Sequence, residues 1–169
     1  MKAEIVQYLS GLGLGSETTT VLIATLPVFE LRGSIPWATF VFDMHWWSAY
    51  FWSILGNLIP VPFILLLLDP IRKFFSRNAS ADKLFQWLFT RTRRRSAVIE
   101  KYQAVGLILF VAIPLPVTGA WTGAMAAYLF GIKFHKAIIN IFCGILIAGI
   151  VVTLACQGLL GFWDLSKSF

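Results

Sequence analysis

Two long stretches of the chain carry no charged side chain, and they constrain its fold more than any other feature. Residues 46–68 and 137–163 contain no Asp, Glu, Lys or Arg. Each stretch exceeds the about 20 residues that a helix needs to cross the hydrocarbon core of a bilayer. Trp46 and Trp47 begin the first stretch and Trp163 ends the second, as is typical of aromatic belts at membrane interfaces. The pattern predicts two transmembrane helices at these positions.

Composition supports a membrane protein and excludes the other broad classes. The 169 residues are 58% hydrophobic and 13% charged, with a mean hydropathy of +0.78. Soluble domains are about 45–50% apolar and about 25% charged. Two cysteines are too few for a disulfide-stapled secreted module. The net charge of +6 indicates a basic cytoplasmic face in so apolar a chain, and we expect no nucleic-acid partner.

Two further apolar stretches are interrupted at their centres. Residues 18–42 carry Glu30 and Arg32 at the middle, and residues 102–132 are uncharged but have a proline-rich segment there. Division at the centre gives arms of about 12 to 15 residues, or about 18–22 Å of helix, which reach only the bilayer midplane. We expect two re-entrant helical hairpins whose tips meet near the bilayer centre. The pattern leaves open whether 18–42 crosses fully instead.

Basic residues set the expected orientation. Most of the 14 Lys and Arg residues lie in the segment 69–101, which we therefore expect to be cytoplasmic. Part of this segment, residues 70–90, is too apolar for a solvated linker and too short to span, which predicts an amphipathic helix on the inner surface. A hairpin at 102–132 also keeps Lys133 and Lys136 on the cytoplasmic side.

The order of elements repeats along the chain. Residues 18–68 form a hairpin followed by a span, and residues 102–163 do the same across the cytoplasmic segment. The tripeptide Leu-Pro-Val at 26–28 recurs at 115–117. We therefore expect an all-α integral membrane protein with two inverted repeats in a single membrane domain, 1–169. Secondary transporters use this architecture, with broken helices meeting at a midplane binding site.

Glu30 and Arg32 are the most informative residues of the first hairpin. At membrane depth each charge costs about 2.5–3.5 kcal/mol on insertion scales, so two charges at one tip need a reason. One interpretation is that the two side chains pair only to cap broken helix ends. The other is that Arg32 holds an anionic headgroup while Glu30 takes up and releases a proton. The expected hairpin-forming residues around them are Pro27, Gly33 and Pro36.

The tip of the second hairpin is uncharged and offers hydroxyls and glycines instead. Hydroxyls beside the backbone N–H groups of a helix N-terminus suit a phosphate or carboxylate, although they also serve as structural caps. Asn57, within the first span, is a candidate hydrogen-bond partner for a hairpin tip or else a helix contact. The candidate binding residues of the second tip are Thr118, Gly119, Trp121 and Thr122, and its hairpin-forming residues are Pro114, Pro116 and Gly123.

Catalytic motifs do not stand out in this sequence. It has no metal-ligand spacing, nucleophile elbow, phosphate-binding loop or pair of catalytic carboxylates. We expect a protein that is not an enzyme and that uses no metal and no cofactor.

Three motifs together resemble a known family. They lie at residues 30–36 (Glu-Leu-Arg-Gly-Ser-Ile-Pro), 56–60 (Gly-Asn-Leu-Ile-Pro) and 114–123. With them the sequence resembles the small multidrug export family of compact membrane proteins, related to the DedA, or VTT-domain, superfamily. The resemblance implies two facing re-entrant hairpins, a prokaryotic cytoplasmic (inner) membrane location and, through the superfamily, lipid translocation. DedA-type second hairpins usually carry arginines, and this second hairpin has none. The resemblance therefore does not extend to specificity for a phosphate lipid.

Our leading hypothesis is a flippase-like transporter that moves an anionic lipid, such as a lipid phosphate, through a midplane site formed by both tips. Cation-coupled efflux of small hydrophobic drugs is the first alternative, with Glu30 exchanging a cationic substrate for protons. A non-transporting membrane scaffold is the second. Membrane lipids are the expected partners, together with a second copy of the chain in a homodimer, because two spans and two hairpins enclose little volume.

Overall fold

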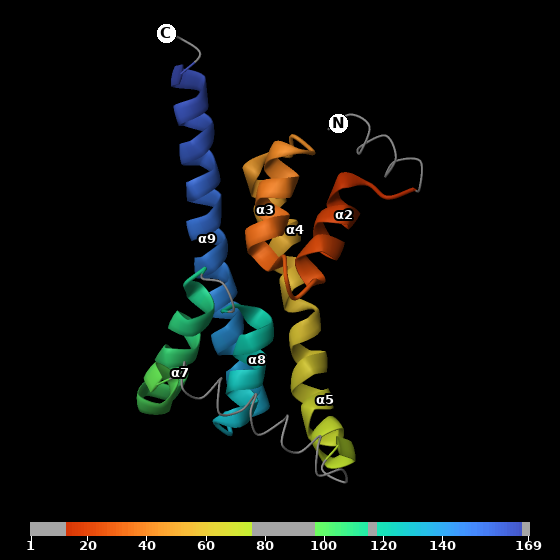
Figure 1. The fold of residues 1–169 in the computed structure, drawn as a ribbon, viewed down its shortest axis with the longest axis vertical. Coiled ribbons are helices and arrows are strands. Elements are labelled where there is room, and N and C mark those ends of the chain that lie inside the picture. Colours follow the sequence, from red (N-terminus) through yellow and green to blue (C-terminus); the bar gives the residue numbers. More distant parts are fainter. Residues whose placement is uncertain (1–12, 76–96, 115–117, 167–169) are drawn as a thin grey trace. The chain divides into compact units, whose positions relative to one another are not determined.

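The computed structural model describes residues 13–75, 97–114 and 118–166. Within those ranges every regular element is an α-helix, so the expected all-α class is confirmed (Figure 1). The helices are α2 (Ser16–Thr25), α3 (Glu30–Phe40), α4 (Trp46–Leu58), α5 (Pro60–Phe75), α7 (Ala97–Ala112), α8 (Ala120–Leu129) and α9 (Phe134–Ser166).

The chain divides into two compact units. Unit 1 comprises residues 1–57 and 146–169, and unit 2 comprises residues 58–145. Unit 1 therefore holds α2, α3, most of α4 and the C-terminal part of α9. Unit 2 holds α5, α7, α8 and the beginning of α9.

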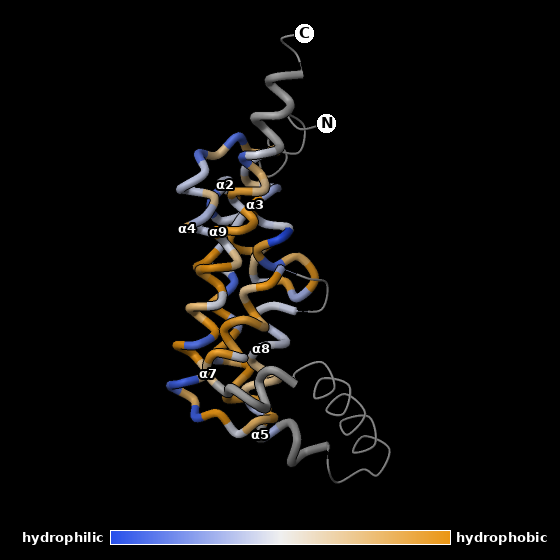
Figure 2. Tube along the Cα trace, turned by 90° about the vertical axis from the view of Figure 1, so that its left-hand side faces the viewer, coloured by the Kyte–Doolittle hydropathy of each residue, from blue (hydrophilic) through white to orange (hydrophobic). Residues whose placement is uncertain are grey.

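Both predicted spans are present as helix. Trp46–Leu68 and Phe134–Gly158 are long and apolar enough to cross a membrane. The first span is interrupted at Ile59, where α4 has ended and α5 begins with Pro60. Proline is favoured at the first position of a helix because its missing N–H has no intrahelical partner there. Figure 2 shows hydrophobic colouring over much of the described helices, with hydrophilic residues in short stretches between.

In unit 1, the interrupted segment 18–42 forms a helix–turn–helix. α2 ends at Thr25, and the next residue, Leu26, has an extended backbone with ψ of 134°, as expected of a residue that precedes a proline. A turn through Pro27 then leads into α3, and α2 packs against α3. The two helices have 10 and 11 residues, about 15 Å each, so neither reaches across a hydrocarbon core of about 30 Å.

In unit 2, a similar break separates α7 from α8. α7 ends at Ala112, Ile113 and Pro114 leave the helix, and α8 begins after Gly119. α8 packs against both α7 and α5. The contact is close because small residues line it: Ala120, Ala124 and Ala127 are all fully buried. Tight packing of this kind is typical of helix interfaces in membrane proteins.

Several expected boundaries differ in detail. α5 continues to Phe75 and α7 begins at Ala97, so both ends of the segment 69–101 are helical. Apolar residues recur at helical spacing beyond Leu68, which extends α5 past the predicted end of the span. The predicted surface helix at 70–90 lies mostly outside the described residues. Re-entry into a membrane and the inverted relation of the repeats stay predictions.

Candidate functional site

Glu30 and Arg32 form an ion pair at the beginning of α3. The Nη2 group of Arg32 donates to Oε2 of Glu30 across 3.3 Å. The carboxylate side chain is 5% exposed and the guanidinium side chain 27% exposed. The negative charge is therefore inside the unit, and the positive charge is the more accessible of the two.

The backbone at Glu30 has an unusual conformation. Its φ is +45°, in the left-handed region that residues other than glycine rarely adopt. Such a residue costs on the order of 1–3 kcal/mol and persists only where its surroundings hold it. Here the N–H of Glu30 donates to the carbonyl of Leu26 at 3.0 Å, which closes the turn around the residue. Strain at a buried charged residue is a recurring feature of functional sites.

Apolar side chains cover the outside of this turn. Val28 is 82% exposed, and Leu26 and Phe29 are each about half exposed. The turn thus presents hydrocarbon outward while its carboxylate points inward. A turn of this construction suits a lipid environment better than water, where an exposed apolar cluster has no favourable contact.

A buried polar surface continues along α3 from the ion pair. Ser34 lies one turn after Glu30, is fully buried, and its Oγ has no hydrogen-bond partner. Pro36, one of the expected hairpin-forming residues, lies inside α3. Because proline has no N–H, Pro36 cannot donate to the carbonyl of Arg32 as a normal helical residue would. The first turns of α3 therefore combine charge, an unpartnered hydroxyl and a missing helical hydrogen bond.

Asn57 is buried on α4 in the same unit. It is 2% exposed and its Oδ1 has no hydrogen-bond partner. Ser53, one turn earlier, is also buried, and its Oγ also has no hydrogen-bond partner. Between them Gly56 lies against α2, where a Cβ would collide with the carbonyl oxygen of Val21. Asn57 therefore directly follows the residue at which α4 meets α2, its Oδ1 makes no hydrogen bond, and its role as a partner of the hairpin tip stays a prediction.

The second turn, in unit 2, is closed by neutral groups. The hydroxyl of Thr118 donates to the carbonyl of Ile113 at 2.7 Å. Gly119 has φ of +141° and ψ of −164°, a region that only glycine adopts readily. Thr122 reaches the carbonyl of Gly119 at 3.4 Å, and Trp121 is half-buried at the start of α8. The Thr118 hydroxyl therefore links the two ends of the turn, and a binding role for it stays a prediction.

The other expected hairpin residues fall in different places. Pro27 and Pro114 lie in the turns, whereas Gly33 lies in α3 and Gly123 in α8. Pro116 is outside the described residues. The ion pair and Asn57 belong to unit 1 and the second turn belongs to unit 2, and the shared midplane site stays a prediction.

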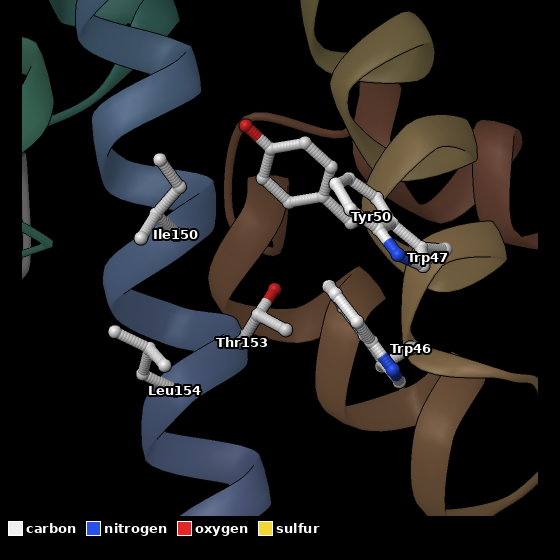
Figure 3. Close-up of a pocket in the computed structure, with 6 residues that line it drawn as sticks. All are labelled: Trp46, Trp47, Tyr50, Ile150, Thr153 and Leu154. Carbon is white, nitrogen blue, oxygen red and sulfur yellow. The ribbon is translucent and has the colours of Figure 1, made fainter.

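One feature of unit 1 was missed by sequence reasoning. A cavity of about 150 Å³ lies between α4 and α9 (Figure 3). The aromatic cluster at the start of α4 was interpreted only as an interfacial belt, and no sequence pattern linked it to α9. The cavity is lined by Trp46, Trp47, Tyr50, Ile150, Thr153 and Leu154.

Within the described residues, no group of three or more His, Cys, Asp or Glu side chains is placed to hold a metal ion. The structure thus has two helices long and apolar enough to cross a membrane, short paired helices and a buried ion pair beside a turn, a combination that suggests a helical membrane protein.

Residues 30–151 match the family described as "Putative small multi-drug export protein", and the chain belongs to this family. The matched region begins at Glu30, the last residue of the first turn, and extends past the second turn. Comparison with curated proteins and with solved structures gave no match. The family membership that the motifs implied is confirmed, and the relation to the DedA superfamily stays a prediction.

Proposed function

We propose that the protein transports an amphipathic organic ion across the membrane, with Glu30 and Arg32 as its substrate-binding and coupling pair. The observation that carries the proposal is the ion pair itself: a carboxylate 5% exposed, held at a left-handed backbone position beside an unpartnered buried hydroxyl. Charges placed at membrane depth are expensive and most often mark substrate or proton pathways.

If the ion pair served only to close the turn, neutral groups could do so at a lower free-energy cost, as the second turn of the same chain shows. The second turn is closed by the Thr118 hydroxyl and by Gly119, with no charged side chain among its described residues. A neutral closure avoids the about 2.5–3.5 kcal/mol that each charge costs in a membrane helix. The charges of the first turn therefore exceed what closing a turn requires, which supports a functional role.

The geometry favours an anionic substrate group. Arg32 is the more exposed partner and offers a planar donor surface that fits phosphate or carboxylate. An anion approaching Arg32 competes with the Glu30 carboxylate for it. Protonation of Glu30 removes that competitor, so uptake of a proton and binding of the anion favour each other. This links substrate movement to proton movement, and an anionic lipid such as a lipid phosphate is the leading substrate class.

Efflux of small hydrophobic cations is the second candidate, and the family description favours it. In this case the ionised Glu30 binds the cation in place of Arg32, and protonation of Glu30 releases it. The two candidates differ in what Arg32 does: it holds the substrate in the first and only competes with it in the second.

Proteoliposomes test both candidates in one design. Purified protein is reconstituted with a fluorescent phosphatidic acid on one leaflet, or with the cationic dye ethidium, under a pH gradient. The leading proposal predicts movement of the lipid faster than in empty liposomes, and its loss in Arg32→Gln. Ethidium efflux that survives Arg32→Gln supports the second candidate. Folded protein that moves neither probe contradicts transport altogether.

We further propose that the segment 18–42 is re-entrant and that the protein acts as a homodimer in a prokaryotic inner membrane, with 69–101 cytoplasmic and no enzymatic activity. A cysteine in place of Glu17, in a chain whose Cys143 and Cys156 are replaced by serine, reports the side on which the hairpin begins. Labelling from outside supports re-entry, and labelling from the cytoplasm shows a full crossing. Cross-linking of two differently tagged copies tests the homodimer.

A further inference from the structure

The cavity of unit 1 is separate from the ion pair and has its own construction. It lies between the first turns of α4 and the part of α9 around Thr153 (Figure 3). One wall is aromatic, made by Trp46, Trp47 and Tyr50, and the other is mainly aliphatic, made by Ile150 and Leu154. Its volume is about 150 Å³, the size of an apolar cavity that accommodates a benzene ring.

The aromatic wall is ordered by contacts among its own rings. Trp46 and Trp47 are stacked with centroids 4.4 Å apart, and Trp47 meets Tyr50 edge-on at 6.1 Å. The Tyr50 hydroxyl donates to the carbonyl of Leu146 at 3.2 Å, which anchors the ring on α9. The ring can approach because position 149 is glycine, where a Cβ would lie 2.8 Å from it. The wall is therefore a prearranged aromatic surface.

Thr153 brings a buried hydroxyl to the α9 side of this cavity. Its Oγ1 has no hydrogen-bond partner and the residue is 7% exposed. In Figure 3 the oxygen points from α9 toward the aromatic side chains. Threonines in helices commonly return this hydroxyl to the carbonyl four residues earlier, as Thr20 and Thr39 do at 2.7 and 2.8 Å. Thr153 does not, and a buried hydroxyl without a hydrogen-bond partner destabilises the fold.

We propose that this cavity binds an organic ammonium ion that carries at least one N–H. The aromatic faces of Trp46, Trp47 and Tyr50 attract a cation through their ring quadrupoles. The N–H donates to the free lone pair of Thr153 Oγ1, and Ile150 and Leu154 contact the apolar part of the ligand. The lining residues include no carboxylate, so aromatic attraction and this hydrogen bond are what select the ligand.

Two sources supply this chemistry in a membrane. One is the headgroup of phosphatidylethanolamine, a primary ammonium that lies at the interface, the level at which tryptophan and tyrosine gather. The other is a free lipophilic amine that partitions into the same layer. Both place an ammonium N–H beside apolar groups, and both are bound without any transport step.

The test uses the full-length protein in nanodiscs of phosphatidylcholine and isothermal titration with three probes. Benzylammonium has a charge and N–H groups, benzyltrimethylammonium has the charge alone, and benzyl alcohol has neither charge nor ammonium. We expect benzylammonium to bind most tightly. Thr153→Val should weaken benzylammonium about tenfold, the value of a hydrogen bond to a charged group, and leave benzyltrimethylammonium unchanged.

Two further variants keep the test decisive. Thr39→Val is the matched control, because that hydroxyl is already bonded to Ile35, and it should change no affinity. Trp47→Leu removes an exposed side chain of the aromatic wall and should weaken both ammonium probes more than benzyl alcohol. Equal binding of all three probes, or a Thr153→Val protein that still prefers benzylammonium by the wild-type ratio, overturns the proposal.

The lipid composition identifies the source. If the lipid headgroup is the resident ligand, adding phosphatidylethanolamine to the nanodiscs should weaken benzylammonium binding in the wild type and not in Thr153→Val. If free amines are the ligands, the wild-type affinity should be the same in both lipid mixtures. Either result supports the site, and the difference assigns its ligand.

Discussion

The two turns that interrupt the apolar segments solve one structural problem in different ways. Each joins two helices and requires a residue at positive φ, which is Glu30 in the first turn and Gly119 in the second. The second uses the residue type with the least strain there and closes with a threonine hydroxyl. The first uses a strained glutamate paired with Arg32. Because a turn without charged groups among its described residues exists in the same chain, the charges of the first turn are the basis of the proposed function.

The interiors of the two units also differ in their polar groups. Among the described residues, every buried side-chain polar atom without a hydrogen-bond partner lies in unit 1. The described interior of α8 in unit 2 consists of alanines and glycines that pack closely. Unit 1 therefore retains buried polar groups that the described interior of α8 lacks, and such groups call for an explanation of their own. The atoms concerned belong to Thr19, Ser34, Trp37, Ser53, Asn57 and Thr153.

The largest stability effect is expected from separating the ion pair. Arg32→Met leaves the Glu30 carboxylate without its cationic partner at 5% exposure, and breaking such a pair should lower the free energy of unfolding by about 3 kcal/mol. The double variant Glu30→Gln, Arg32→Met removes both charges and should recover most of the loss. Unfolding by sodium dodecyl sulfate in mixed micelles, followed by circular dichroism, measures both. Equal stability of the single and double variants would show that the pair is not coupled.

A somewhat smaller effect is expected where α2 packs against α4. In Gly56→Ala the new Cβ meets backbone atoms of Val21 within 3 Å, which cannot move without shifting α2. Overpacking of this kind should cost about 2–3 kcal/mol. Gly158→Ala is the matched control, because that position is open and helical, and alanine should stabilise it by a few tenths to about 1 kcal/mol. The same micellar unfolding assay compares them, and equal effects would refute the close approach.

The third largest stability effect is expected from the backbone of the second turn. Gly119→Ala forces a residue with a Cβ into a φ of +141°, at a cost of about 2 kcal/mol. The converse experiment relieves the strain in the first turn and compares two double variants. Glu30→Gly combined with Arg32→Met should be more stable than Glu30→Gln combined with Arg32→Met, because glycine adopts a φ of +45° without strain. If glycine brings no gain at position 30, the first turn is not strained and the comparison between the turns weakens.

The smallest effect is expected from Thr118. Thr118→Val keeps the shape of the side chain and removes only the hydrogen bond to Ile113, a loss of about 1 kcal/mol. Thr118→Ser should retain most of the wild-type stability because it keeps the hydroxyl. A loss of stability as large as that of Arg32→Met would mean that the hydrogen bond of the neutral turn contributes as much to stability as the ion pair of the charged turn.

Sequence alone was sufficient for features that depend on local chemistry. The two spans follow from apolar length, and the breaks at Pro27 and Pro114 follow from the missing proline N–H. The proximity of Glu30 and Arg32 was also predictable, because two residues separated by one position in a turn can meet. Family membership followed from the three motifs and was confirmed.

The rest depends on tertiary contacts that no local pattern contains. The position of Pro36 inside α3 is one example, because proline usually interrupts a helix and only its surroundings decide whether the helix continues. The unpartnered hydroxyl of Thr153 and the cavity around it arise from packing between α4 and α9, which are far apart in sequence. The positive φ of Glu30 could not be anticipated, because glutamate is not a residue that favours that region.

Transport measured in variants of the two turns tests the central claim most directly. Wild type, Glu30→Gln and Thr118→Val are reconstituted at equal amounts, and movement of the fluorescent phosphatidic acid and of ethidium is followed under a pH gradient. The account predicts that Glu30→Gln abolishes gradient-driven transport of whichever probe the wild type moves, while Thr118→Val retains it. Wild-type transport by a folded Glu30→Gln protein would contradict the claim that the charged turn carries the function.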